Sequence, residues 1–262
     1  QVAGGSAPLT YSWSPSGGSA SSATALSAGT YDVTVTDANG CTSTTQVTIV
    51  EPTLLNTSIA EAVDLSCNGA KDGSISITAT GGTPTYSYAW TPASTNTSAI
   101  TNLAAGSYSV LVTDLNGCTS TIAATIAEPT ALTASTSPID ALCNGGNSGS
   151  ATANVSGGTA GYTYLWSPTG GSTSNATNLV AGNYTVTITD VNGCTTTSSA
   201  TIAEPTLLTA AITGSTDASC FGGNNGSASV NANGGTANYT YLWSPSGGTG
   251  SSATNLAAGN YS

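Results

Sequence analysis

Six cysteines recur in two kinds of position, and the chemistry that such residues perform outside the cell is covalent cross-linking. Within each set, consecutive cysteines lie 76 or 77 residues apart. The first set opens a short glycine loop and the second set closes an Asp-x-Asn-Gly turn. Metal binding by these cysteines is not favoured, because the chain has no His and no Cys-x-x-Cys pair. The loop set is Cys67, Cys143 and Cys220, and the turn set is Cys41, Cys118 and Cys194.

Three aspartates are the other residues that could do chemistry. Asp37, Asp114 and Asp190 each precede an Asn by two residues, and carboxylate and amide oxygens are ligands that Ca²⁺ accepts. The same Asp-x-Asn-Gly pattern also builds a tight hairpin turn, because Asn-Gly adopts positive φ easily. We therefore expect a turn at these positions, keep the three aspartates as weak calcium candidates, and predict no other cofactor.

The charge balance excludes several classes of function. Lys71 is the only basic residue, against 12 acids and a net charge of −11. Nucleic-acid binding and electrostatic docking on anionic lipid both need clusters of Lys and Arg. Without His, and without an acid pair that recurs away from turns and joints, we predict that the chain is not an enzyme. No apolar stretch reaches the roughly 18 residues of a membrane span, so this segment is not expected to insert into a membrane.

The cysteines and aspartates belong to a longer repeat. Four tryptophans lie 77, 76 and 77 residues apart, and Glu-Pro pairs begin at Glu51, Glu128 and Glu204 with the same spacing. Because the chain starts and stops inside a unit and lacks Met, we expect it to be part of a longer polypeptide. The predicted organisation is a C-terminal part of a repeat at 1–51, complete repeats at 52–128 and 129–204, and an N-terminal part at 205–262.

Each unit has six or seven short stretches with apolar residues at every second position, and no helical periodicity. This pattern predicts an all-β fold of tandem immunoglobulin-like sandwiches in an elongated rod. A parallel β-helix is the alternative fold, although its repeats are much shorter. The Leu-x-Ala-Gly-x-Tyr pattern resembles the tyrosine corner of such sandwiches. The predicted core residues are Trp13, Trp90, Trp166, Trp243, Tyr31, Tyr108, Tyr184 and Tyr261.

Three disulfide pairings remain open. In a seven-strand sandwich the A–B loop and the F–G turn lie at opposite ends, roughly 26 Å apart for eight-residue strands. A bridge needs Cα atoms about 5.5 Å apart, so seven strands favour a bond between neighbouring repeats, whereas six strands would allow one within a repeat. The pairings are Cys67–Cys194 between repeats; Cys67–Cys118 and Cys143–Cys194 within repeats; and Cys41–Cys67, Cys118–Cys143 and Cys194–Cys220 across the joints.

The unit resembles the SprB repeat of Bacteroidota surface proteins, the tandem module of the gliding-motility adhesin and its relatives. The matching motifs are Cys-Asn-Gly-x-x-(Asp/Asn)-Gly-Ser at Cys67–Ser74, Gly-Gly-Thr-x-x-Tyr-x-Tyr-x-Trp at Gly81–Trp90, Leu-x-Ala-Gly-x-Tyr, and Asp-x-Asn-Gly-Cys followed by Glu-Pro. The resemblance implies export by the type IX system, a cell-surface or extracellular location, and a part in adhesion, gliding motility or filament building.

The function that we expect is a structural stalk or filament segment of a large secreted cell-surface adhesin. The alternatives are a repeated module that binds surface polysaccharide or a protein partner, and a subunit of a multi-chain extracellular fibre. The variable loops favour the stalk, because they contain mainly Ser, Thr, Ala, Asn and Gly, as at Ser94–Ser98. The expected partners are neighbouring repeats of the same chain, other copies in a filament, and surface polysaccharide.

Overall fold

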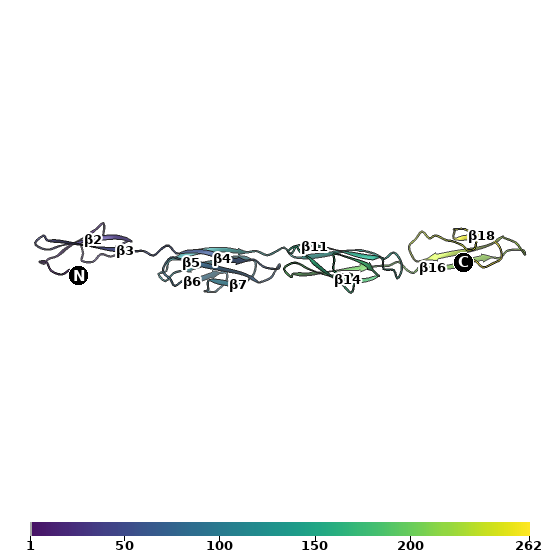
Figure 1. Cartoon of the computed structure of the whole chain (residues 1–262), viewed down its shortest axis with the longest axis horizontal. Helices are drawn as coiled ribbons and strands as arrows, with labels where there is room; N and C mark the ends of the chain where they lie inside the picture. The colour runs from purple at the N-terminus through teal and green to yellow at the C-terminus, as the bar shows by residue number, and fades with distance from the viewer. Residues whose placement is uncertain (1) are drawn as a thin grey trace. The chain divides into compact units, whose positions relative to one another are not determined.

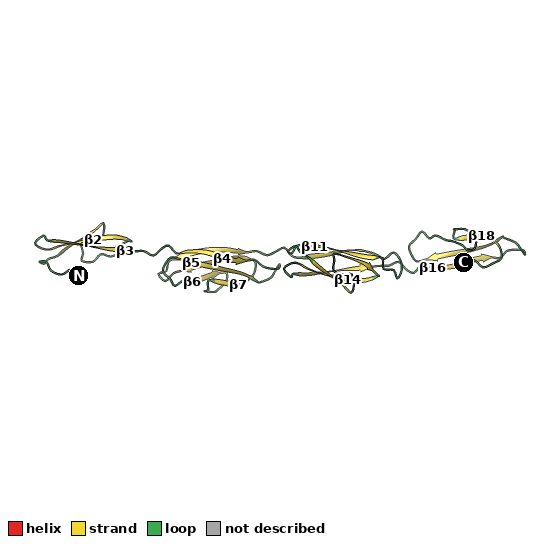
Figure 2. Ribbon diagram, viewed as in Figure 1, coloured by secondary structure: helices red, strands yellow, loops and turns green. Residues whose placement is uncertain are grey.

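The computed structural model describes residues 2–262, and all the regular structure in that range is β-strand (Figure 2). Strand labels follow Figure 1. None of the described residues forms a helix long and apolar enough to cross a membrane. The strands are β1 (Thr10–Ser14), β2 (Gly29–Thr36), β3 (Thr42–Ile49), β4 (Asn56–Val63), β5 (Gly73–Thr80), β6 (Ser87–Thr91), β7 (Ala99–Leu103), β8 (Gly106–Thr113), β9 (Thr119–Ile126), β10 (Thr133–Ile139), β11 (Gly149–Ser156), β12 (Thr163–Ser167), β13 (Asn175–Leu179), β14 (Gly182–Thr189), β15 (Thr195–Ile202), β16 (Thr209–Thr216), β17 (Gly226–Asn233) and β18 (Ser252–Leu256).

The strands form six three-stranded sheets that repeat one scheme. The second repeat has sheets of order β4-β5-β7 and β6-β8-β9, and the third has β10-β11-β13 and β12-β14-β15. In immunoglobulin lettering these are an A-B-E sheet and a C-F-G sheet, so the predicted all-β, immunoglobulin-like repeat is confirmed. Before residue 52 the described chain has the sheet β1-β2-β3, and after residue 204 it has β16-β17-β18.

The contacts between residues divide the chain into two compact units. The first takes the chain up to Ala62 with Ser74–Thr101 and Ser107–Thr125; the second takes Val63–Gly73, Asn102–Gly106 and Ile126–Ser262. This border runs through the second repeat, so the predicted repeat boundaries stay a prediction. The third repeat lies wholly inside the second unit and shows the sandwich in full.

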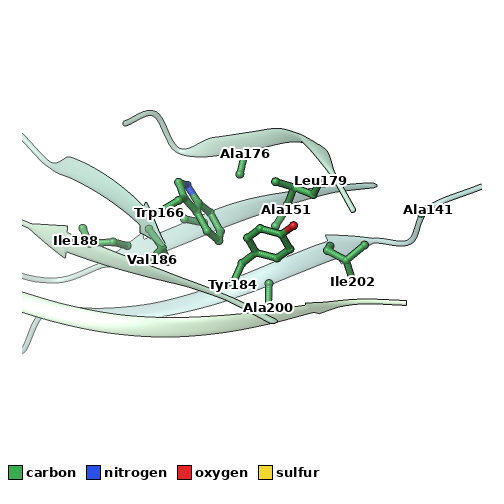
Figure 3. Packing of buried hydrophobic residues seen from close by; sticks show 11 residues of the cluster. Ala141, Ala151, Trp166, Ala176, Leu179, Tyr184, Val186, Ile188, Ala200 and Ile202 are labelled. Carbon is green, nitrogen blue, oxygen red and sulfur yellow. The ribbon is translucent and has the colours of Figure 1, made fainter. Parts of the chain in front are cut away.

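The core of the third repeat confirms the predicted alternation. Along β14, Tyr184, Val186 and Ile188 are buried while the residues between them are not. Trp166 on β12 lies opposite Val186 and is 4% exposed. Figure 3 shows these side chains gathered with those of the facing sheet. The cluster also contains Ala141, Ala151, Ala153, Ala176, Leu179, Ala200 and Ile202.

Two of the eight predicted core residues are less buried than expected. Trp13 and Tyr261 are half-buried, whereas Trp90, Trp166, Trp243, Tyr31, Tyr108 and Tyr184 are buried. Trp13 lies on β1, in a three-stranded sheet that has no facing sheet of its own repeat within residues 2–51. Tyr261 lies beyond β18, where the described chain has no C-F-G sheet to cover it.

The strand count is six in each complete repeat, and the missing one is strand D. After β12, the N–H of Trp166 donates to the carbonyl oxygen of Gly171 at 3.1 Å, and its indole N–H donates to that of Thr173 at 3.0 Å. The segment between β12 and β13 thus bonds back to Trp166 instead of pairing as a strand.

The loss of strand D does not bring the A–B loop and the F–G turn to one end. β10 and β15 run parallel, since Thr136 Oγ1 donates to the Ser199 carbonyl and the Ala203 N–H donates to Asp140 Oδ1. β14 is antiparallel to β15, and β11 is antiparallel to β10. The A–B loop therefore lies at one end of the sandwich and the F–G turn lies at the other. The expectation that a six-strand repeat would place both at one end is wrong.

The tyrosine corner is present. The hydroxyl of Tyr184 donates to the carbonyl oxygen of Val180 at 3.1 Å, and Tyr31 and Tyr261 make the same bond to Ser27 and Ala257. This bond holds the start of strand F against the loop that precedes it.

We expect Tyr184→Phe to lower the free energy of unfolding by about 0.5–1.5 kcal/mol, because the substitution removes one hydrogen bond and keeps the buried ring. Chemical denaturation followed by circular dichroism measures the change. An unchanged midpoint and slope would show that the corner does not stabilise the repeat.

Candidate functional site: the joint between the second and third repeats

One disulfide joins two repeats in the part of the chain that the structure describes. Cys67 in the A–B loop of the second repeat is bonded to Cys194 at the F–G turn of the third, with Cα atoms 5.7 Å apart. Both residues belong to the second compact unit. Of the three pairings left open by the sequence, the structure has the one between neighbouring repeats. Cys41, Cys118, Cys143 and Cys220 are free and exposed.

The position of the one disulfide also accounts for the four free cysteines. A loop cysteine of one repeat pairs with a turn cysteine of the next, and Cys67 with Cys194 is the one such pair that this sequence offers. The equivalent partner positions of Cys41, Cys118, Cys143 and Cys220 lie outside residues 1–262. The Cys143–Cys194 pairing within the third repeat does not form, because the A–B loop and the F–G turn of that repeat lie at opposite ends.

The turn that carries Cys194 is held by a buried aspartate. Asp190 is 4% exposed; its Oδ1 accepts the N–H groups of Asn192 and Cys194 at 3.0 and 2.9 Å. Its Oδ2 accepts the N–H of Thr159 at 2.9 Å, which ties the F–G turn to the loop after β11. The Asn192 side chain donates to Thr159 Oγ1 and to the Ser66 carbonyl at 3.0 and 3.1 Å. The turn thus contacts the A–B loop of the preceding repeat beside the disulfide.

The other two turns are held by the same pattern of hydrogen bonds to an aspartate. Asp114 bonds the N–H groups of Asn116, Cys118 and Thr83, and Asp37 bonds those of Asn39, Cys41 and Ser6. In all three the loop donor precedes the aspartate by 31 residues. The aspartates therefore build the turn, as the Asn-Gly pattern predicts.

The calcium candidates gain no support from this geometry. Both oxygens of each carboxylate accept backbone N–H groups, and a cation would have to displace those donors. The described residues contain no group of three or more His, Cys, Asp or Glu side chains placed to hold a metal ion. We expect added calcium to leave the melting temperature unchanged; a rise that chelation reverses would restore the calcium site.

The hydrogen bonds also set the acidity of these groups. The N–H of Thr159 holds the pKa of the Asp190 carboxyl below its ordinary value, with the N–H groups of Cys194 and Asn192 acting in the same direction against the effect of burial. The Thr83 N–H lowers the pKa of Asp114 in the same way, and the Ser6 N–H lowers that of Asp37.

Acid is therefore expected to weaken the repeats. Since the pKa of Asp190 is lower in the folded chain than the unfolded value of about 3.9, its contribution to stability is complete above that pH and is lost as the pH falls through the folded pKa. Melting temperatures measured from pH 7 to pH 2 should fall below about pH 4. The Asp190→Asn variant should be less stable at pH 7 and lose less on acidification; an acid response equal to that of the parent would contradict this assignment.

A glutamate at the end of each complete repeat fixes the linker. The N–H of Gly69 donates to Glu128 Oε2 at 2.7 Å, and the Asn68 side chain donates to the Pro129 carbonyl at 3.0 Å. One repeat later the N–H of Gly145 donates to Glu204 Oε2 at 2.6 Å. The Glu-Pro pair thus binds the A–B loop of its own repeat. The sequence indicated only a boundary there, although the shared spacing of Glu-Pro and Cys-Asn-Gly was a signal for this contact.

The linker is also docked on the repeat that follows. The N–H of Gly158 donates to the Thr130 carbonyl at 2.8 Å, and Gly157, with φ +75°, lies against the backbone of Ala131. The joint is therefore built from four kinds of contact: the disulfide, the hydrogen bond from Asn192 to Ser66, the Glu128 bonds to the preceding loop, and the backbone contacts of the Gly-Gly pair.

These features define a tandem immunoglobulin-like repeat protein with covalently linked repeats. The SprB repeat family model matches the chain three times, at residues 59–95, 135–171 and 212–250. These three matches agree with the resemblance to the SprB repeat that the sequence motifs indicate.

Two solved structures have limited likeness to the chain. One is described as three N-terminal domains of the bacteriophage RB49 highly immunogenic outer capsid protein (Hoc), with 20% identity over 75% of this chain and 86% of that one, and a TM-score of 0.39. Another, from work on Dscam isoform specificity, has 16% identity and a TM-score of 0.29 over 67% of this chain. The chain spans about half of that structure's length, 54%. No curated protein matches.

Proposed function

We propose that the chain is a load-bearing spacer segment of a large secreted cell-surface adhesin. The observation that carries the proposal is the joint, where the Cys67–Cys194 bond and the hydrogen bond from Asn192 to Ser66 fix one repeat to the next. A spacer needs joints that resist bending and extension, and a flexible linker would supply neither. The SprB repeat and the disulfide also support a location outside the cell.

The adhesion or gliding role and export by the type IX system come from the SprB resemblance and form part of this proposal. The side chains are consistent with a mechanical role, since the sequence has one basic residue and no His. A spacer uses its surface to stay soluble and its core to stay folded, and the hydroxyl-rich strands β14 and β15 suit that use.

Small-angle X-ray scattering of the oxidised chain tests the spacer. A compact globule of this length would have a radius of gyration of about 18 Å. A rod of tandem repeats predicts at least about twice that value, and a value near the compact one would contradict the proposal. The molecular mass from the same scattering data tests the multi-chain fibre, because a mass greater than that of one chain would favour it.

One side chain favours the binding alternative. Phe221 is fully exposed and stands where the other two loops have Asn68 and Asn144. An exposed ring can stack on a sugar, so surface polysaccharide is the ligand to test. On a glycan array the spacer proposal expects no specific binding. Reproducible binding that Phe221→Asn abolishes would instead establish a binding module.

A further inference from the structure

The disulfide changes which residues carry tension. A pull on the two chain ends travels along covalent bonds, and at Cys67 it can pass directly to Cys194. The 127-residue separation between them then lies on a closed loop. We propose that the Cys67–Cys194 bond removes residues 68–193 from the load path of the chain, so that most of the second and third repeats cannot be extended by force.

What remains on the path near the bond is already extended. The chain reaches Cys67 through β4, Asn56–Val63, and leaves Cys194 through β15, Thr195–Ile202. A strand rises about 3.3 Å per residue, close to the limit of about 3.6 Å for a stretched chain. Detaching these strands from their sheets therefore releases little length.

The closed loop contains core residues of both sandwiches, so tension on the chain ends does not act on them directly. Trp90, Val110, Trp166 and Val186 are all buried and all lie between the bonded cysteines. β4 and β15 are the outer strands of their sheets. Force can therefore act on two edge strands, while the central strands and their core side chains stay off the path.

The placement of the bond explains why it acts over two repeats. A bond within a repeat, such as Cys67–Cys118, would enclose part of one sandwich and leave the linker at Pro129 under load. The observed bond encloses that linker together with the Glu128 contact to Gly69. Tension then bypasses the joint's hydrogen bonds. This inference rests on the disulfide connectivity and does not depend on the proposed adhesin role.

Single-molecule force spectroscopy on the full chain, held by its two ends, tests the proposal. The protein carries Cys41→Ser, Cys118→Ser, Cys143→Ser and Cys220→Ser, so that Cys67–Cys194 is the one bond that can form. Complete unfolding of the oxidised protein should release about 440 Å less contour length than the same protein in reductant, since 127 residue steps at roughly 3.5 Å stay closed.

A matched variant with Cys67→Ser added should release the full length with or without reductant. If that variant does not fold, the comparison of oxidised and reduced parent protein decides the question alone. Equal contour lengths for the oxidised and reduced parent would overturn the proposal.

Discussion

Replacing Trp166 with alanine is expected to lower the free energy of unfolding of the third repeat by about 3–5 kcal/mol. The ring is 4% exposed, packs in the cluster with Val186 and Tyr184, and anchors the segment that replaces strand D through its indole N–H bond to Thr173. The substitution therefore leaves a cavity and also frees the Thr173 carbonyl. Chemical denaturation followed by circular dichroism measures the loss.

The neighbouring residue is the matched control for this substitution. Leu165 is 64% exposed on the same strand, and the second repeat has Ala89 in its place. Leu165→Ala should change the free energy of unfolding by no more than about 0.5 kcal/mol. If both substitutions cost the same, the tryptophan is not the centre of the sandwich core.

Gly157→Ala is expected to be the most damaging single change at the joint. Gly157 has φ +75°, which costs other L-residues about 1–2 kcal/mol. In addition, its new Cβ would collide with the carbonyl oxygen of Ala131, and backbone cannot move aside without releasing the linker. We expect a lower melting temperature and a lower yield of the Cys67–Cys194 bond on oxidative refolding, because the collision displaces the linker between the bonded repeats.

Gly171→Ala separates the two effects. Gly171 also has positive φ, at +86°, but a Cβ there meets no atom within 4 Å. That variant should show only the conformational cost of about 1–2 kcal/mol and a normal yield of the disulfide. Equal behaviour of the two variants would show that the contact with Ala131 does not hold the joint.

The sequence predicted the repeat and its strands well because both depend on local patterns. The alternation in Gly182–Thr189 identified a buried strand, and the Leu-x-Ala-Gly-x-Tyr pattern identified the corner at Tyr184. The role of Asp190 as a turn residue was also expected from Asn-Gly. The pattern did not predict the hydrogen bond from the Thr159 N–H to Asp190, because Thr159 lies in a loop 31 residues earlier in the chain.

The partner of each cysteine could not be predicted from local sequence patterns. Spacing alone cannot assign Cys67 a partner, because Cys118 and Cys194 occupy equivalent positions in successive repeats. The decision needs strand directions, and strand count was a poor guide to them. The segment after Trp166 crosses the sandwich without pairing, so the six-strand repeat keeps the directions of a seven-strand one.

Peptide mapping without reductant tests the central claim, a covalent bond between the second and third repeats, most directly. Cleavage before each aspartate places all six cysteines in separate peptides, because an aspartate lies between every two consecutive cysteines. The account predicts that the peptide 64–71, with Cys67, is linked to the peptide 190–216, with Cys194. A link from 64–71 to 114–139, which holds Cys118, or to 37–63, which holds Cys41, would contradict it.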